Sequence, residues 1–216
     1  MSKYQSNSIY FYPGTNVLRN KQEIKDQHAL ESYERQIASD KIILLAEKPI
    51  QGNFSLGHMK KIHKFIFGSI YPFAGEVRQE GISKGNTHFA HPNHIDAAAK
   101  EIFSELKAER FLKGKSFDEF CERASYYYSE VNMLHPFREG NGRTQRELFR
   151  VLGLRNGFNI NWNLVGGEEL VNASIASVLD ETAFKPIFNK VITNEVPDKA
   201  LIKEYKRSLD QNQLEI

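Results

Sequence analysis

The chain has 216 residues, with 29 basic and 27 acidic side chains and a formal net charge of +2. This length suits one globular domain, and a content of 40% hydrophobic and 12% aromatic residues excludes a disordered chain. The near balance of charge excludes a strongly basic nucleic-acid coat protein, so we expect no direct nucleic-acid partner.

Features that the sequence lacks indicate the compartment. Cys121 is the one cysteine, so no internal disulfide can form and no oxidising environment is implied. Residues 1–10 contain no apolar signal-peptide core, and the longest aliphatic run, residues 42–46, is far shorter than the roughly 20 residues of a membrane span. We expect a cytoplasmic protein without a membrane partner, although secretion without a cleaved signal would leave the same pattern.

The first half of the chain predicts two helices followed by a hairpin. Gln27–Glu47 has few helix breakers and carries apolar residues near helical spacing. Ser55 can cap a second helix, which has an apolar stripe over residues 56–67. The helical period is absent from residues 76–92, which predict a short hairpin that we call the flap, because we expect it to cover a site. Its turn is expected at Lys84, Gly85 and Asn86.

The second half predicts a helical bundle, so the expected fold class is mainly all-α with one small β-hairpin. A helix resumes at His94, and the Ser116 to Glu119 spacing of a capping box opens a strongly apolar helix that should be the most buried one. Pro136 disfavours helical geometry for the residue before it, so this helix should end near His135. Further helices are predicted at residues 143–157, 168–179 and 183–192.

The loop from His135 to Arg146 begins a helix in a way that suits an anion. Gly140 and Gly142 remove two side chains where the helix starts, so backbone N–H groups can converge on a bound anion. The helix dipole favours negative charge at the same point. Asn141 can supply an additional amide donor.

The charged side chains of this loop suit phosphate chemistry. Arg143 and Arg146, three residues apart on the first turn, offer two guanidinium groups to phosphate oxygens. Glu139 places a carboxylate beside them, as a magnesium ion that bridges phosphates requires. The ordinary pKa of histidine lies near neutral pH, so we expect His135 to accept a proton from an attacking hydroxyl. A surface ion-pair cluster is the alternative interpretation, but such a cluster needs no bare backbone glycines.

The loop resembles the signature of Fic-domain proteins, in which His-x-Phe-x-Asp/Glu-Gly-Asn-Gly-Arg-x-x-Arg occurs, and every fixed position is met. Residues 12–20 resemble the N-terminal arm of Fic toxins, and residues 71–75 with 82–85 resemble the Phe-Ala-Gly segment and flap of the family. The similarity covers about residues 10–193. It implies a Fic fold for residues 1–193.

The polar segment 194–216 follows the region of similarity. We expect it to form a peripheral helix, a frayed tail or the start of a following segment.

The resemblance also implies the activity, which is transfer of AMP from ATP to a Ser, Thr or Tyr hydroxyl of a protein. His135 would deprotonate the hydroxyl, Glu139 would hold Mg²⁺ against the α- and β-phosphates, and Arg146 would meet the γ-phosphate. The flap would pin the target peptide by strand addition. The implied nucleotide-binding residues are Gly140, Asn141, Gly142, Arg143, Arg146, Lys84, Gly85 and Asn132.

The resemblance bears on regulation and partners as well. Many Fic proteins are inhibited by their own helix with a Ser/Thr-x-x-x-Glu-Gly/Asn pattern, whose Glu pairs with the second Arg of the signature. Residues 177–181 come close to this pattern, but Thr182 departs from its last position. We therefore expect a separate small antitoxin to supply the inhibitory helix. Relatives of that kind modify ATPase subunits of bacterial type II topoisomerases, or host proteins after secretion, so the expected role is that of a toxin or effector.

Other interpretations stay open beside this one. A transferase with another donor, such as UMP, phosphocholine or phosphate, could use the same loop, although intact Gly142 and Arg143 favour adenylylation. A catalytically idle binding module would use the flap to capture a partner strand. A metal site is also conceivable at three histidines near the flap, but the intervening Pro92 prevents a shared helical face, so a solvated flap is favoured. These histidines are His88, His91 and His94.

Overall fold

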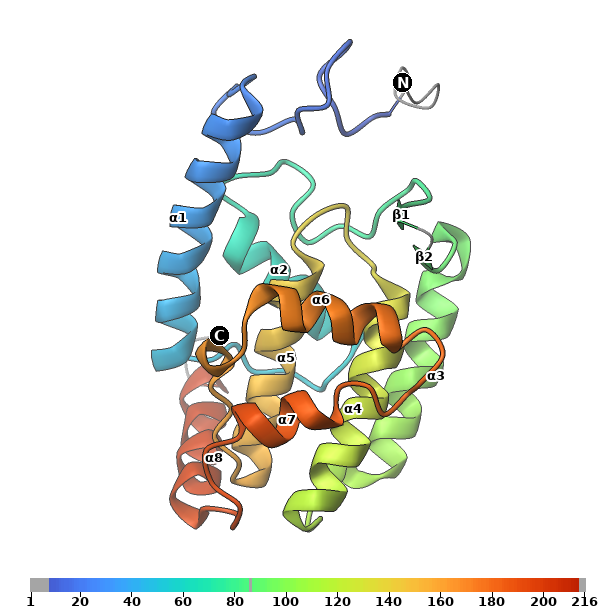
Figure 1. The fold of residues 1–216 in the computed structure, drawn as a ribbon. Coiled ribbons are helices and arrows are strands. Elements are labelled where there is room, and N and C mark those ends of the chain that lie inside the picture. Colours follow the sequence, from blue (N-terminus) through green and yellow to red (C-terminus); the bar gives the residue numbers. More distant parts are fainter. Residues whose placement is uncertain (1–7, 86, 214–216) are drawn as a thin grey trace.

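In the computed structural model, residues 8–85 and 87–213 are described, and they form a layered helical bundle with a small hairpin at one end (Figure 1). The longer helices are α1 (Gln27–Glu47), α2 (Leu56–Phe67), α3 (Ile95–Ala108), α4 (Phe117–Leu134), α5 (Asn141–Asn156) and α8 (Lys199–Gln213). The shorter helices are α6 (Gly167–Ala176) and α7 (Lys185–Val191). The mainly all-α fold class predicted from the sequence is confirmed.

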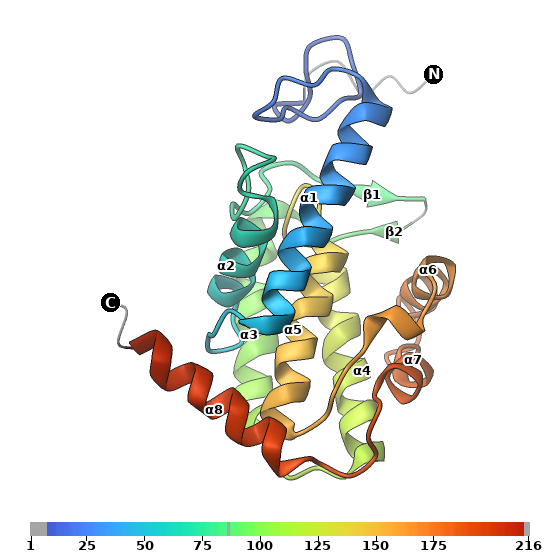
Figure 2. The same cartoon turned by 90° about the vertical axis from the view of Figure 1, so that its left-hand side faces the viewer.

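Helices α4 and α5 form the centre of the bundle. Helix α5 packs against α2, α4 and α8, while α4 also contacts α3 and α7 (Figure 2). The ring of Tyr128 on α4 lies 5.0 Å from that of Phe149 on α5 and 4.4 Å from that of Phe184, which precedes α7. These aromatic contacts join three helices into one core, because each ring excludes a large area from water. The sequence predicts that α4 is the most buried helix, but ten of its 18 residues are buried against ten of the 16 residues of α5, so the two helices share the centre of the core.

Side-chain caps fix the starts of the helices where the sequence predicts them. The carboxylate of Asp26 accepts a hydrogen bond from Ala29 N at 2.8 Å, and Ser55 Oγ accepts one from His58 N at 3.2 Å. Ser116 and Glu119 form the complete capping box, with Ser116 N donating to Glu119 Oε2 at 2.8 Å. Each cap satisfies an N–H group that has no partner within its helix.

The hairpin is shorter than the flap segment that the sequence suggests. Strands β1 (Ser83–Lys84) and β2 (Thr87–His88) pair antiparallel, with Ser83 opposite His88 and Lys84 opposite Thr87. Asn86, which is expected in the turn, lies outside the described residues. Outside these two short strands, the flap follows the surface of the bundle and makes hydrogen bonds to the loop after α4.

Several boundaries differ from the predicted ones. Helix α5 begins at Asn141 instead of Arg143, because Gly140 supplies the left-handed turn just before it. Helix α6 ends at Ala176 instead of residue 179. There Asp180 accepts hydrogen bonds from the backbone and hydroxyl of Thr182, and such local bonds compete with a helix.

The C-terminal segment forms helix α8, which packs against α5. The side chain of Tyr205 is buried, and Asp198 N donates a hydrogen bond to Gly157 O at 2.8 Å. Of the three alternatives for residues 194–216, the described part corresponds to a peripheral helix. No helix in the described part of the chain combines the length and the apolar character that crossing a bilayer requires.

Candidate active site

The catalytic candidate His135 lies at the point where helix α4 ends. Its backbone is left-handed, with φ of 42°, and its N–H still donates to Val131 O, so it closes the last turn. Pro136 follows and cannot continue the helix, because it has no N–H. The chain therefore turns sharply here and presents the His135 side chain to a cavity of about 670 Å³.

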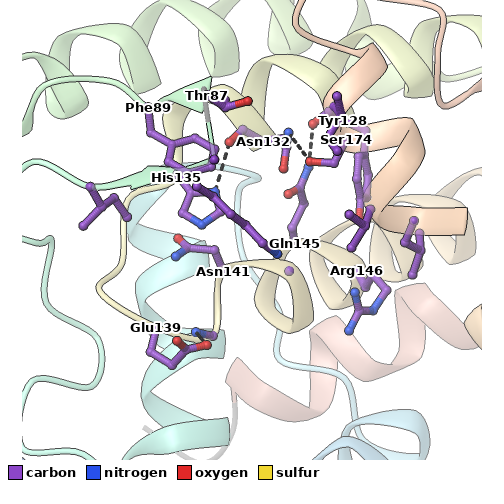
Figure 3. A pocket seen from close by; sticks show the side chains of 18 of the residues that line it. Thr87, Phe89, Tyr128, Asn132, His135, Glu139, Asn141, Gln145, Arg146 and Ser174 are labelled. Carbon is purple, nitrogen blue, oxygen red and sulfur yellow. Dashed lines mark hydrogen bonds between the residues drawn. The ribbon is translucent and has the colours of Figure 1, made fainter. Parts of the chain in front are cut away.

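Contacts on two sides orient the imidazole of His135. Its ring stacks on Phe89 of the flap, with ring centroids 3.8 Å apart, and Nδ1 lies 3.2 Å from Asn132 O (Figure 3). Because a carbonyl only accepts hydrogen bonds, Nδ1 of the neutral ring carries the hydrogen and Nε2 keeps its lone pair. Nε2 is therefore the atom that can accept a proton.

Burial is the largest influence on the protonation of His135, and it lowers the pKa of the ring to about 4. The hydrogen bond to Asn132 O opposes this effect, while the positive charges of Arg78 and Lys84 add to it. At neutral pH the imidazole is thus uncharged and able to act as a base.

The start of helix α5 is open toward the cavity. Gly140 is the N-cap residue with φ of 79°, and it has no side chain to bond to the first N–H groups. A Cβ at this position would overlap the Phe67 ring. The first turn of α5 thus keeps backbone donors for an anion, as the sequence predicts.

The Asn141 side chain braces the loop. Its Oδ1 accepts a hydrogen bond from Phe137 N at 2.8 Å, and its Nδ2 donates to Phe137 O at 2.7 Å. Asn141 lines the cavity, but these bonds use its amide mainly to hold the loop in shape. One of the two N–H donors of the Asn141 amide is therefore engaged within the loop.

Glu139 fits a divalent cation. Its side chain is 42% exposed and lines the cavity, and Oε1 accepts a hydrogen bond from Gly140 N at 2.9 Å. The described residues contain no cluster of three or more His, Cys, Asp or Glu side chains that could hold a metal ion. A cation here would therefore be held by this one carboxylate together with phosphate oxygens and water, which is the mode that Mg²⁺ commonly uses.

The far side of the cavity carries Arg146 and a polar pair. Burial raises the pKa of Tyr128 to about 12, and the nearby positive charge of Arg146 opposes this effect. Asn132 Nδ2 donates to Ser174 Oγ at 2.9 Å, which links α4 to α6. Gly142 lies beside Arg146, and a Cβ added to it would be 3.3 Å from Arg146 Nη1.

The Arg143 side chain forms ion pairs with Glu34 and, at 3.5 Å, with Glu139. Its guanidinium lies 2.7 Å from Glu34 on α1 and stacks over the Phe67 ring at 4.6 Å. The residues that line the cavity do not include Arg143. They do include the other predicted site residues, which are His135, Glu139, Gly140, Asn141, Gly142, Arg146, Asn132, Lys84 and Gly85.

The structure adds residues that sequence reasoning missed. His63 on α2 stacks on Phe137 with ring centroids 4.0 Å apart, accepts from Gly75 N at Nδ1 and donates from Nε2 to Glu139 O, both at 2.8 Å. Arg78 and Phe89 contact His135 from the flap. No local pattern marks these residues, because their partners lie far away in the sequence.

Comparison with known proteins agrees with this site. Residues 53–152 match the Fic/DOC family. The chain is 45% identical over 178 residues to "Protein adenylyltransferase VbhT" of Bartonella schoenbuchensis, an alignment that covers 82% of this chain and 37% of VbhT. It is 31% identical over 185 residues to "Probable protein adenylyltransferase Fic" of Escherichia coli K12, which covers 85% of this chain and 92% of that protein.

A solved structure supports the same relationship. The N-terminal Fic domain of a VirB-translocated Bep effector protein from Bartonella quintana, solved with bound ADP, superposes with a TM-score of 0.81 at 26% identity. The match covers 90% of this chain and 97% of that domain. From its sequence, fold and relatives, the chain belongs to the Fic/DOC family, among the members named protein adenylyltransferases.

Proposed function

We propose that this chain transfers AMP from ATP to a Ser, Thr or Tyr hydroxyl of a target protein, with His135 as the general base. The observation that carries the proposal is the neutral imidazole of His135, which faces the same cavity as the open N-terminus of α5. A base on one side of a cavity and backbone N–H donors for an anion on the other side suit the attack of a hydroxyl on a bound phosphate. The family relationship supports the choice of ATP and of a protein target.

In this reaction the target hydroxyl oxygen bonds to the α-phosphorus and its proton goes to His135 Nε2. The bond from the α-phosphorus to the bridging oxygen breaks, and pyrophosphate leaves with the electron pair. The N–H groups at Gly142 and its neighbours on the first turn of α5 would hold the phosphates, and Arg146 would meet the γ-phosphate. A Mg²⁺ ion at Glu139 would supply charge neutralisation for the phosphate oxygens.

The flap is positioned to hold the target. Lys84 and Gly85 line the cavity beside His135, and the strands on either side of the turn are short and exposed. An extended segment of the target could pair with the edge of this hairpin, which would bring its hydroxyl to the base. The resemblance to Fic toxins suggests a bacterial topoisomerase ATPase subunit or a host protein as the target. The similarity to VirB-translocated Bartonella effectors favours an effector role as much as a cytoplasmic toxin role.

Regulation by a separate antitoxin is part of the proposal. Glu181, the acidic residue of the near-match to the inhibitory pattern, lies in the exposed loop after α6, and its carbonyl accepts hydrogen bonds from Ser125 and Ser129. In the described part of the chain, its side chain makes no contact with Arg146. This placement favours an inhibitory Glu that comes from another chain.

The test incubates the protein with α-labelled ATP and Mg²⁺ in a bacterial lysate and in a human-cell lysate, beside His135→Ala. We expect label on a protein band with wild type and its loss with His135→Ala, while calorimetry shows that both proteins bind a non-hydrolysable ATP analogue. His94→Ala is the matched control, since His94 is an exposed histidine near the flap. Label from γ-labelled ATP would contradict adenylylation, and partner capture that survives His135→Ala without Mg²⁺ would indicate a binding module.

A further inference from the structure

Arg78 is a buried arginine at the base of the flap. It is 2% exposed and is among the largest fully buried side chains of the protein. Within the described residues no carboxylate forms an ion pair with it, although buried charges usually have such a partner. A buried guanidinium without a carboxylate partner has to donate its hydrogen bonds to uncharged acceptors. The identity of these acceptors shows what Arg78 holds in place.

Backbone carbonyls of three segments surround the Arg78 guanidinium. Nε donates to His135 O at 2.8 Å, Nη1 donates to Glu80 O at 2.8 Å, and Nη2 donates to Ala90 O. The backbone N–H of Arg78 also donates to Pro136 O at 2.9 Å. One side chain thus joins both arms of the flap to the residue that would act as base.

The carbonyl of His135 needs such a donor. With φ of 42°, the His135 backbone has a left-handed conformation that is unfavourable for a non-glycine residue. Helix α4 has ended, so no helical N–H follows to bond this carbonyl. A charged donor makes the strongest hydrogen bond available to it, and the planar guanidinium fork can reach the other two carbonyls in the same plane.

The same arrangement holds the His135 ring. Ala90 is fixed on both sides, since its carbonyl accepts from Arg78 and its N–H donates to Met133 O at 3.0 Å. Phe89, the residue before it, is the aromatic partner of the imidazole. The position of the Phe89 ring and the position of the His135 backbone therefore both depend on one guanidinium.

We propose that Arg78 is a positioning residue that fixes the His135 imidazole against the flap, so that hydroxyl activation depends on a side chain that does not itself line the cavity. The proposal rests on the proposed function for the role of His135. Nucleotide binding should be independent of Arg78, because the phosphate cradle lies at Gly140 to Arg146, on the other side of the loop.

The test compares wild type with Arg78→Lys, which keeps the charge and loses the planar fork. Proteins with ¹³C-labelled histidine are examined by NMR, with ring signals assigned from His135→Ala and His63→Gln. The His135 signal should lose the ring-current shift from Phe89, while the His63 signal, shifted by Phe137, stays in place and serves as the internal control. Equal movement of both signals, or of neither, would overturn the proposal.

Activity provides the second readout. The rate of label transfer from α-labelled ATP should fall roughly a hundredfold in Arg78→Lys, as for a misplacement of about 1 Å in a reacting group, with unchanged affinity for a non-hydrolysable ATP analogue. Arg150→Lys is the matched control, since Arg150 also donates to a backbone carbonyl, Leu45 O at 2.7 Å, but lies away from the cavity. A similar loss of transfer in both variants would contradict a specific role.

A measurement on wild type keeps the proposal testable if Arg78→Lys does not fold. The Arg78 Nε–H, assigned from backbone experiments, should exchange with water far more slowly than the Nε–H of exposed Arg110. Exchange at the same rate would overturn the proposal. The NMR results do not depend on enzymatic turnover, so a failure of the proposed function and a failure of this inference can be distinguished.

Discussion

At the scale of single residues, His135 combines a left-handed backbone with a ring stacked between Phe89 and the end of α4. Both features cost free energy of folding, and each contributes to the position or the protonation of the imidazole. The sharp turn brings the imidazole to the cavity, and the burial keeps it neutral. Asn132 O then decides which ring nitrogen is free to take a proton.

The protonation of His135 gives a prediction about pH. Its pKa is lowered to about 4, mainly by burial, so the ring should stay neutral as pH falls from 8 to 5 in the free protein. An NMR titration of labelled histidine, with the His135 signal assigned from His135→Ala, measures this. We expect the His135 signal to shift only as the pH approaches 4. A midpoint near the ordinary value of 6.5 would contradict the burial that the structure gives this ring.

The two glycines of the loop should respond differently to a methyl group. Gly140→Ala forces a left-handed φ on alanine and drives a Cβ into Phe67, so the free energy of unfolding should fall by at least about 1 kcal/mol. Gly142 has a helical backbone, and the Cβ of Gly142→Ala would meet only the flexible end of Arg146 at 3.3 Å. The free energy of unfolding should therefore be unchanged or slightly raised. Urea unfolding of both variants measures the difference.

The same pair also separates stability from function. The added methyl of Gly142→Ala lies at the cavity, so affinity for an ATP analogue should fall although the protein is fully folded. Unchanged affinity in Gly142→Ala would exclude this turn from phosphate binding.

At the scale of elements, helix α2 is the platform for the catalytic loop. His63 and Phe67 lie one turn apart on the same face of α2. His63 holds the carbonyl of Glu139, and Phe67 lies directly under Gly140. The loop is therefore fixed against α2 on one side and against the flap on the other.

The capping box at the start of helix α4 should affect the stability of the protein without affecting the distant cavity. Ser116→Ala removes the capping box, which should lower the free energy of unfolding by about 1 kcal/mol, while Ser116→Thr should retain most of it. The cap lies about 28 Å from His135 along the helix, at about 1.5 Å per residue. Affinity for an ATP analogue should therefore be unchanged in both variants. A change in affinity with Ser116→Ala would mean that the cap transmits its effect to the site.

At the scale of the whole molecule, the cavity is assembled from parts that are distant in sequence. The flap supplies Lys84 and Phe89, His135 follows the last residue of α4, α5 contributes its first turn from Asn141, and α6 closes the far side through Ser174. Ion pairs and hydrogen bonds join these parts over long separations, such as the 109 residues between Glu34 and Arg143. The site therefore exists only in the folded protein.

His58 gives a prediction for the stability of the whole fold. This buried ring donates from Nε2 to Ile50 O at 2.8 Å, while its Nδ1 is buried without a hydrogen-bond partner in the described structure. Burial lowers the pKa of His58 below its ordinary value of 6.5. Because the unfolded chain takes up the proton first, stability should be lost as the pH falls through and below 6.5.

Thermal unfolding between pH 8 and pH 5 measures this contribution. His58→Gln keeps a donor for Ile50 and cannot titrate, so its melting temperature should fall less steeply with acid than that of wild type. His28→Gln, at an exposed position on α1, is the matched control and should follow wild type. If the melting temperatures of wild type and His58→Gln fell in parallel with pH, His58 would not contribute to the loss of stability in acid.

The sequence by itself determined the features that depend on neighbours in the chain. Helix α1 has the predicted bounds, and the capping box at Ser116 is present, because caps and helical periods involve residues only three or four apart. The signature from His135 to Arg146 is contiguous, so its histidine, glutamate, glycines and arginines could be recognised, and with them the family.

Only the tertiary structure decided how these residues are used. Arg143, predicted as a phosphate ligand, forms ion pairs with Glu34 and Glu139 in this structure, and the amide of Asn141 braces the loop. Arg78 lies 57 residues from His135, and no period or motif connects the two. Long-range packing sets side-chain directions and protonation, because burial and partner charges come from segments that meet only when the chain folds.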